Sequence, residues 1–334
     1  MNQIKNIERA VILFVLFGIV LFAAFAMARI GTLKALPLSQ QAAERFAGQS
    51  GRHFVQLSAF FHPENEVSEF QILLFNEKLQ NGLRSSGNGG ITVPFAYSCS
   101  SDLTVQSARG SFRVPAIGMG GDFFLFHPYR LLYGSLMELP AGNGIIVTDR
   151  AAWLLFGAVE VVDQPVLIGG KAYLISGVVS LEDDQASREA LDGADCMVFV
   201  PYSALATGVT CYEVILPEPV KGYGESLFAN LKTGNTVTNT MRFSAKAIWT
   251  AICMLPEYNM DALSAPVPYW ENTARNIEMR IILWTALLYF LLLPAVGVLF
   301  FVLCIPFFIL ALHTVQKQKG ALLNKLHGKE WLNK

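Results

Sequence analysis

Two long apolar segments without charged residues lie near the two ends of the 334-residue chain, and about 250 mostly polar residues separate them. The first segment, Ala10 to Ala28, is long enough for one membrane crossing, because about 30 Å of hydrocarbon requires about 20 apolar helical residues. The second, Ile281 to Leu312, is longer. The pattern therefore predicts a membrane protein with one large water-facing domain between two apolar anchors.

The second apolar segment fits two arrangements. Its 32 residues exceed the length of one upright helix and barely suffice for two, and Pro294 and Pro306 interrupt it. One tilted, kinked helix or a tight hairpin would serve. We expect one crossing, because an odd number of crossings here would place the middle domain outside the cell.

Lysine and arginine positions predict the orientation, since positively charged flanks stay in the cytoplasm. The tail after His313 has five lysines and one glutamate, a net charge of about +4, and is predicted to be cytoplasmic. Removing the two ends leaves the middle near −6, which argues against nucleic-acid binding. We therefore expect a multi-pass protein of the plasma or inner membrane with an extracytoplasmic central domain.

A cleaved signal peptide is the alternative for the first segment, because Ala26-Met27-Ala28 has the form of a cleavage site. Its apolar core is longer than such peptides use, which favours a retained helix. The exported cysteines, Cys99, Cys196, Cys211 and Cys253, leave disulfides and free buried thiols both open.

Hydrophobic periodicity predicts an α+β domain between the two membrane helices. The stretch from Leu38 to Asn81 is helix-like and is expected to begin with a stalk that continues the first membrane helix. A Gly/Ser cluster ends it at Arg84–Gly90. Short strands follow, with the sequences ITVPFAY, FRVPAIG, GIIVTD, PVLIGG, AYLISGVV, CMVFVPY and YEVILP, and helices are expected at Asp149–Phe156 and Gly224–Leu231.

The chain is expected to return to the membrane through a second helical stalk, Asn272 to Arg280. Three nearby aromatic residues, Tyr269, Trp270 and Trp284, are typical of the lipid headgroup region, and packing within the domain is the alternative.

No motif for catalysis, cofactors or metals is evident. Gly169-Gly170-Lys171 lacks the remaining residues of a phosphate-binding loop and is predicted to be a hairpin turn. The histidines His53, His62 and His127 lack metal-ligand spacing. The acidic residues Glu182, Asp183 and Asp184 are expected in a solvated loop. We therefore predict a protein that is not an enzyme.

The stretch Ala116 to Ala204 carries an ordered series of motifs. They are Ile117-Gly-Met-Gly-Gly-Asp-Phe-Phe124, Leu131-Leu-Tyr-Gly134, Ile145-Ile-Val-Thr-Asp149, Ala152-Trp-Leu-Leu-Phe-Gly157, Val166–Tyr173, Ile175-Ser-Gly-Val-Val179 and Met197-Val-Phe-Val-Pro-Tyr202. This order resembles the extracytoplasmic core domain of MacB-like ABC transporter permeases, within the wider FtsX-like group. Leu291-Leu-Leu-Pro294 resembles part of the membrane helix that follows this domain in such permeases.

The resemblance implies a separate ABC ATPase and a basic cytoplasmic helix that docks on it. An apolar and basic stripe in the tail matches that helix or, equally, a membrane-surface anchor. Its residues are Lys317, Lys319, Leu322, Leu323, Lys325, Leu326, Lys329 and Trp331. The family normally has further membrane helices after this point, and this sequence departs from it by ending at Lys334.

These observations predict a non-catalytic permease-type subunit that transmits ATPase-driven motion to its outer domain, with membrane lipid, an ATPase and either a second copy or a permease partner as neighbours. The alternative is a membrane-anchored sensor or binding subunit without an ATPase. The expected segments are a cytoplasmic N-terminus (1–9), a membrane helix (10–30), a stalk and helical segment (31–90), the core domain (91–265), a second stalk (266–280), a second membrane segment (281–312) and the tail (313–334).

Overall fold

The structure is a computed structural model that describes residues 2–35, 38–61, 67–85, 92–136, 142–191, 195–205, 207–229, 235–238, 269–271, 273–274, 277–294 and 297. The chain forms two compact units, one of Met1–Ile30 with Leu283–Lys334 and the other of Gly31–Ile282. Pro306, Cys253 and the predicted tail site from Lys317 to Trp331 lie outside the described residues.

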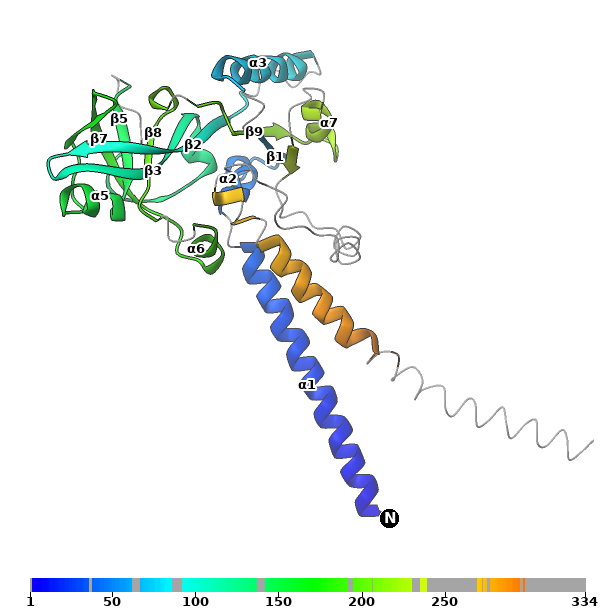
Figure 1. Ribbon diagram of the computed structural model, residues 1–334. Coiled ribbons are helices and arrows are strands. Elements are labelled where there is room, and N and C mark those ends of the chain that lie inside the picture. Colours follow the sequence, from blue (N-terminus) through cyan, green and yellow to red (C-terminus); the bar gives the residue numbers. More distant parts are fainter. Residues whose placement is uncertain are drawn as a thin grey trace, which may run out of the picture. The chain divides into compact units, whose positions relative to one another are not determined.

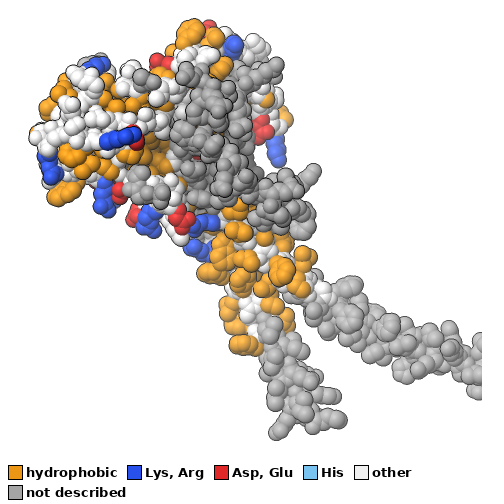
Figure 2. All heavy atoms as spheres, viewed as in Figure 1, with side chains coloured by type: hydrophobic (Ala, Val, Ile, Leu, Met, Phe, Trp, Pro, Cys, Tyr) orange, Lys and Arg blue, Asp and Glu red, His pale blue; other side chains and the backbone are white. Residues whose placement is uncertain are grey.

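Two helices have the length and composition needed to cross a membrane. They contain the apolar spans Leu16–Ala35, within helix α1 (Asn2–Ala35), and Ile277–Pro294. In the first unit the Trp284 ring lies 5.7 Å from the Phe25 ring and 6.3 Å from that of Phe22. Hydrophobic side chains cover the described surface of α1 (Figure 2), as lipid contact requires. This confirms the prediction of a membrane-type helix toward each terminus.

The second unit is built on a sheet, and its described residues form ten strands (Figure 1). The strand order is β10-β1-β9-β2-β3-β8-β5-β7-β4, with β6 pairing with β2 and β7. Neighbours are antiparallel except for β3 with β8 and β5 with β7. The strands are β1 (Phe54–Phe60), β2 (Phe95–Ser107), β3 (Gly110–Gly121), β4 (Arg130–Gly134), β5 (Gly144–Thr148), β6 (Pro165–Ile168), β7 (Lys171–Ser180), β8 (Val198–Pro201), β9 (Cys211–Pro217) and β10 (Asn235–Thr238).

Short helices cover this sheet and bury three apolar clusters. The helices of the second unit after α1 are the 3-10 turn η1 (Leu38–Gln40), α2 (Ala42–Ala47), α3 (Glu69–Ser85), α4 (Phe123–Phe126), α5 (Asp149–Phe156), α6 (Gln185–Leu191), the 3-10 turn η2 (Tyr202–Ala204) and α7 (Tyr223–Ala229). Residues of α3 and α7 pack with β1 and β9, residues of α5 pack with β5 and β7, and residues of α2 and α4 help to form the third cluster. The mixed helix and strand architecture confirms the predicted α+β class.

The start and end of α5 show how local sequence fixes an element. Thr148 accepts a hydrogen bond from the Ala151 backbone amide at 3.2 Å, which satisfies an otherwise unpaired donor at the first turn. Gly157 ends the helix with a positive φ of 74°, a conformation that glycine adopts without strain. The predicted helix Asp149–Phe156 is confirmed, and α7 confirms the second predicted helix within two residues at each end.

The glycine predictions also hold. Gly169 and Gly170 have φ values of 58° and 79° and join β6 to β7, with Ile168 opposite Lys171, so this segment is a hairpin turn. Gly121 has φ 68°, and a Cβ there would lie 2.4 Å from the Phe95 carbonyl oxygen. At the first position of the Gly-Asp-Phe-Phe motif the backbone therefore passes so close to Phe95 that only glycine fits.

All seven predicted strand sequences contain or overlap strands, but the expectation of helix from Leu38 to Asn81 is correct only in part, because α2 and α3 are helices and a strand lies between them. Strand β1 lies inside that stretch and is buried on both faces. Val55, Leu57 and Ala59 alternate with Gln56 and Ser58, so the period-two pattern of a strand is present in the sequence, although the polar positions face a buried carboxylate and not solvent. The helix α1 ends at Ala35, and α2 is a separate short helix, so no continuous helical stalk runs through residues 38–47.

The cysteines of the described residues are free thiols: Cys99 and Cys211 are buried, and Cys196 is half-buried. Burial raises the pKa of all three thiols, most strongly that of Cys211. They behave as core residues, because a protonated buried thiol is unreactive.

Candidate functional site

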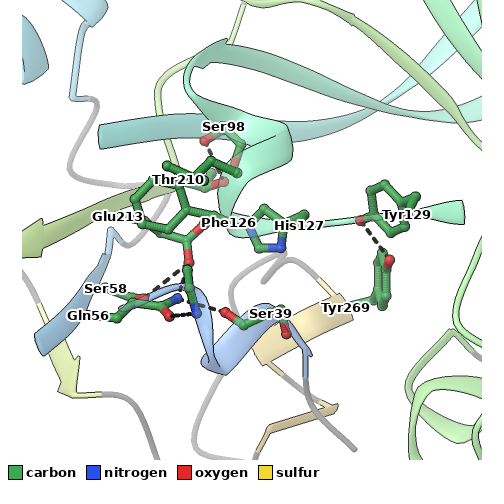
Figure 3. A network of polar contacts seen from close by, with 12 residues as sticks. Ser39, Gln56, Ser58, Ser98, Phe126, His127, Tyr129, Thr210, Glu213 and Tyr269 are labelled. Carbon is green, nitrogen blue, oxygen red and sulfur yellow. Dashed lines mark hydrogen bonds and ion pairs between the residues drawn. The ribbon is translucent and has the colours of Figure 1, made fainter. Parts of the chain in front are cut away.

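A buried polar cluster lies beside strands β1 and β9, within the second unit (Figure 3). It joins these strands to two segments that are adjacent in sequence to the terminal helices: residues 38–47, after α1, and residues 269–274, before the helix that contains Ile277–Pro294. We call it the polar junction. Its members are Ser39, Gln56, Ser58, His127, Tyr129, Glu182, Glu213, Tyr269 and Trp270.

Glu213 is at the centre of the polar junction. It is 1% exposed, and its position on β9 places it opposite Ser58 of β1. One carboxylate oxygen lies 2.5 Å from His127 Nε2, and the other accepts hydrogen bonds from Ser58 Oγ at 3.2 Å and Gln56 Nε2 at 3.5 Å. Burying a carboxylate is costly unless such donors surround it. His127 Nε2 and the Glu213 carboxyl group are therefore hydrogen-bonded to each other in the buried interior.

Gln56 connects Glu213 to the segment that follows α1. Its amide nitrogen donates to the Ser39 carbonyl at 2.7 Å, and its amide oxygen accepts from the Ala42 backbone N–H at 3.0 Å. Ser39 is 3% exposed. One side chain thus fixes both η1 and the first turn of α2 to strand β1.

Arg45 of α2 provides a second attachment for the same segment. Its guanidinium donates to the carbonyl oxygens of Leu125 at 2.8 Å and Phe126 at 3.1 Å, and also to the Leu38 carbonyl. These bonds satisfy backbone acceptors at the end of α4, which has too few residues to satisfy its own. As a result, α2 is attached to both β1 and α4.

Trp270 attaches the other segment. Its ring centroid lies 4.2 Å from that of His127 and 5.7 Å from that of Phe123, and the residue is 1% exposed. The indole covers the imidazole that pairs with Glu213. Tyr269 and Trp270 therefore belong to the domain core, so the expected placement at the membrane interface is wrong for both and the packing alternative is confirmed.

A chain of hydroxyl groups extends the polar junction toward α6. Tyr269 Oη lies 2.7 Å from Tyr129 Oη and 2.8 Å from Glu182 Oε2. When Glu182 is ionised, Tyr269 donates its single proton to Glu182 and accepts one from Tyr129. Burial raises the pKa of both tyrosines, so they stay protonated and able to donate.

The predicted solvated acidic loop is correct only in part. Asp183 is exposed and pairs with Arg188 at 2.8 Å, and Asp184 accepts from the backbone amides of Ala186 and Ser187 at the start of α6. Glu182 differs, because it is half-buried beneath Tyr269. Its burial was invisible in sequence because its partner is 87 residues away.

We expect Glu182→Gln to increase stability at neutral pH. Burial raises the pKa of Glu182, so the folded chain binds this proton more tightly than the unfolded chain. Its contribution to stability is fully present below the pKa of the unfolded glutamate and is lost as pH rises through the higher folded pKa. Glutamine accepts the same Tyr269 bond without a charge. The variant's advantage in urea unfolding should therefore grow with pH.

Asp183→Asn is the matched control for that experiment, since Asp183 is adjacent in sequence but exposed. It should show no comparable advantage at any pH. A Glu182→Gln advantage that stays constant across pH would contradict a role for Glu182 ionisation.

The polar junction suits mechanical attachment and not catalysis. His127 is 0% exposed and sealed by Trp270, so a substrate has no route to the His127–Glu213 pair. In the described part of the chain, no group of three or more His, Cys, Asp or Glu residues is arranged to hold a metal ion. A buried polar network in which most groups are hydrogen-bonded holds the segments that it joins in one rigid packing arrangement.

Sequence reasoning missed His127 and Glu213 as partners. The one available signal was a glutamate inside an otherwise apolar strand, Cys211–Pro217, since a charge in a buried strand requires a partner. His127 was considered only as a possible metal ligand. Its pairing with Glu213 depends on contact across 86 residues, which no local pattern reports.

The sequence matches the profile of the MacB-like periplasmic core domain family over residues 12–242. A comparison with curated proteins found no match. Solved structures with a similar arrangement include the periplasmic region of MacB from Actinobacillus actinomycetemcomitans, at 12% identity and a TM-score of 0.40, covering 62% of this chain and 94% of that one.

Two further structures are similar to this chain. The extracellular domain of the ABC-type transporter YknZ from Gram-positive bacteria has 16% identity and a TM-score of 0.36, with 56% of this chain and 99% of that chain covered. A domain of a permease protein from Porphyromonas gingivalis has 10% identity and a TM-score of 0.32, with 63% and 82% covered.

Proposed function

This chain belongs to the MacB-like periplasmic core domain family, and from that premise we propose that it is a permease-type subunit that transmits ATPase-driven motion across the membrane. Family membership gives the chain a role associated with membrane transport and a domain of the extracytoplasmic type. The proposal adds a multi-pass topology in the cell membrane, a mechanical role without catalysis, and an energy source on another chain.

In this proposal a separate chain supplies the ATPase. The sequence in hand has no G-x-x-x-x-G-K-[ST] loop, the motif whose backbone amides hold nucleotide phosphates in such motors. The proposal includes assembly with a second copy or with another permease chain. The basic tail from Lys317 to Trp331 is the proposed contact with the ATPase or with the membrane surface.

The observation that carries the proposal is that one buried carboxylate joins both segments adjacent to the terminal helices. From Glu213, one path runs through Gln56 to Ser39 and α2. The other runs through His127 to Trp270. Because both segments are bonded to the same sheet, we expect a displacement of either terminal helix to exert a force on strands β1 and β9. A packed interior transmits such a force because it has low compressibility.

Affinity purification of the full-length chain from its native membrane tests the proposal. We expect an ATPase with a phosphate-binding loop to co-purify, and its ATP hydrolysis to change when the chain is removed from the complex. A chain truncated after His313 is the matched control, and it should lose the ATPase if the tail is the contact. Reproducible absence of any ATPase, with a soluble ligand retained, would contradict the proposal and support a sensor or binding subunit.

A further inference from the structure

Beside α2, the second unit has an open hollow of about 730 Å³, which the polar junction does not use. Its volume is within the roughly 300–1,000 Å³ of typical small-molecule sites. The loop between α2 and β1, the start of β2, and α4 with its preceding turn surround it. We infer that this hollow binds an amphiphile with a single carboxylate, such as a medium- or long-chain fatty acid.

The apolar part of the hollow is built from Phe46, Phe54, Pro94 and Leu125. The Phe46 and Phe54 rings meet edge to face with centroids 5.1 Å apart, and Phe46 is 36% exposed although it lies on the face of α2 beside the core. Covering an exposed aromatic ring at a concave surface with another apolar group lowers the free energy of the system. An alkyl chain supplies that cover without needing hydrogen bonds.

The charges at the rim select the headgroup. Arg52 is exposed, and its guanidinium has no ion-pair or hydrogen-bond partner among the described residues. A guanidinium binds a carboxylate through two parallel hydrogen bonds. The hydroxyl groups of Ser50 and Thr92 also line the hollow and can donate to the same anion.

Asp122 limits the charge of the ligand. It also lines the hollow, and its Oδ2 accepts the Phe95 backbone N–H at 3.3 Å. A headgroup with two negative charges would satisfy Arg52 but bring its second charge toward this carboxylate. A monoanion avoids that repulsion, so a carboxylate is favoured over a phosphate dianion.

Occupancy of this site would act on α2. Phe46 of α2 and Leu125 of α4 both line the hollow, and Arg45 of α2 donates to the Leu125 carbonyl at 2.8 Å. A bound chain would therefore contact both sides of the attachment that holds the segment after α1. The ligand-binding inference itself does not depend on the proposed coupling to an ATPase.

Photolabelling tests the inference on the full-length chain in nanodiscs of phosphatidylcholine, which avoids competition from detergent. The probe is a C16 fatty acid with a diazirine in its chain, and the comparison is the corresponding C16 alcohol. We expect mass spectrometry to find the acid on peptides that contain Phe46, Phe54 or Leu125, with at least about tenfold less labelling by the alcohol. Labelling confined to the terminal helices would overturn the inference, because it would report partition into lipid alone.

Arg52→Gln should reduce that labelling by about tenfold, and Arg52→Lys should restore part of it, since lysine keeps the charge but not the bidentate geometry. Arg113→Gln is the matched control, because Arg113 is an exposed arginine of the β2–β3 hairpin that pairs with Asp102. It should leave labelling unchanged. Equal labelling of wild type and Arg52→Gln, or stronger competition by a C16 monoalkyl phosphate than by the fatty acid, would overturn the assignment. No ATPase is present, so either result is separate from the fate of the proposed function.

Discussion

Replacing His127 with leucine should lower the free energy of unfolding by about 3–5 kcal/mol, because it leaves the Glu213 carboxyl group buried without its closest partner. Ser58 and Gln56 lie farther from the carboxylate, at 3.2 and 3.5 Å, and cannot replace a donor at 2.5 Å. The measurement is urea unfolding of the solubilised full-length chain, followed by tryptophan fluorescence.

The double variant His127→Leu, Glu213→Leu distinguishes two causes of the lost stability. One is loss of the attraction within the pair, and the other is the cost of burying a carboxyl group without its partner. The double variant should recover most of the loss, because apolar replacement of both partners removes the desolvation cost. Recovery should be incomplete, since Ser58 Oγ loses its acceptor while Gln56 keeps the Ser39 carbonyl. Arg113→Ala, which breaks an exposed pair with Asp102, should cost no more than about 1 kcal/mol. A His127→Leu cost as small as this control would mean that the Glu213 carboxyl group does not need His127 as a partner.

Trp270→Ala should also cost about 3–5 kcal/mol, the range for removing a large buried aromatic side chain. Trp270 is 1% exposed, packs on His127 and Phe123, and is the attachment of residues 269–274 to the polar junction. Its loss removes packing and opens the His127–Glu213 pair to water. Urea unfolding, monitored here by far-UV circular dichroism because a tryptophan is lost, checks the prediction.

Trp153→Ala is the matched control within the same domain. Trp153 lies on α5 and is 61% exposed, so truncating it should change stability by less than about 1 kcal/mol. Equal costs for the two variants would contradict the assignment of Trp270 to the core, and would return it to the membrane-interface role that its sequence position suggested.

The elements that could be predicted from sequence are those whose cause is local. Helix α5 has its cap and its terminating glycine within a few residues, and the β6–β7 turn has both glycines in place. Strand β1 was missed although its signal is local, because the longer stretch around it favours helix. Val55, Leu57 and Ala59 alternate with Gln56 and Ser58, which is the pattern of a strand. The burial of Gln56 and Ser58 could not be predicted, because their partner Glu213 is more than 150 residues away.

The polar junction was unpredictable for the same reason. Its members come from η1, β1, the turn after α4, the loop between β7 and α6, β9 and residues 269–270, and only the fold brings these together. The family resemblance was accessible because it depends on the order of local motifs. The attachments of the two helix-adjacent segments depend on side-chain pairs across the sheet, which no motif records.

Hydrogen–deuterium exchange on the purified complex of this chain with the proposed ATPase tests the central claim most directly. Comparing the nucleotide-free state with the ATP–vanadate state, the account predicts that protection changes together in the peptides that contain Gln56, Glu213 and Trp270, and that His127→Leu abolishes this change while ATP still binds. Nucleotide-dependent changes confined to the terminal helices, with these three peptides unaffected, would contradict it.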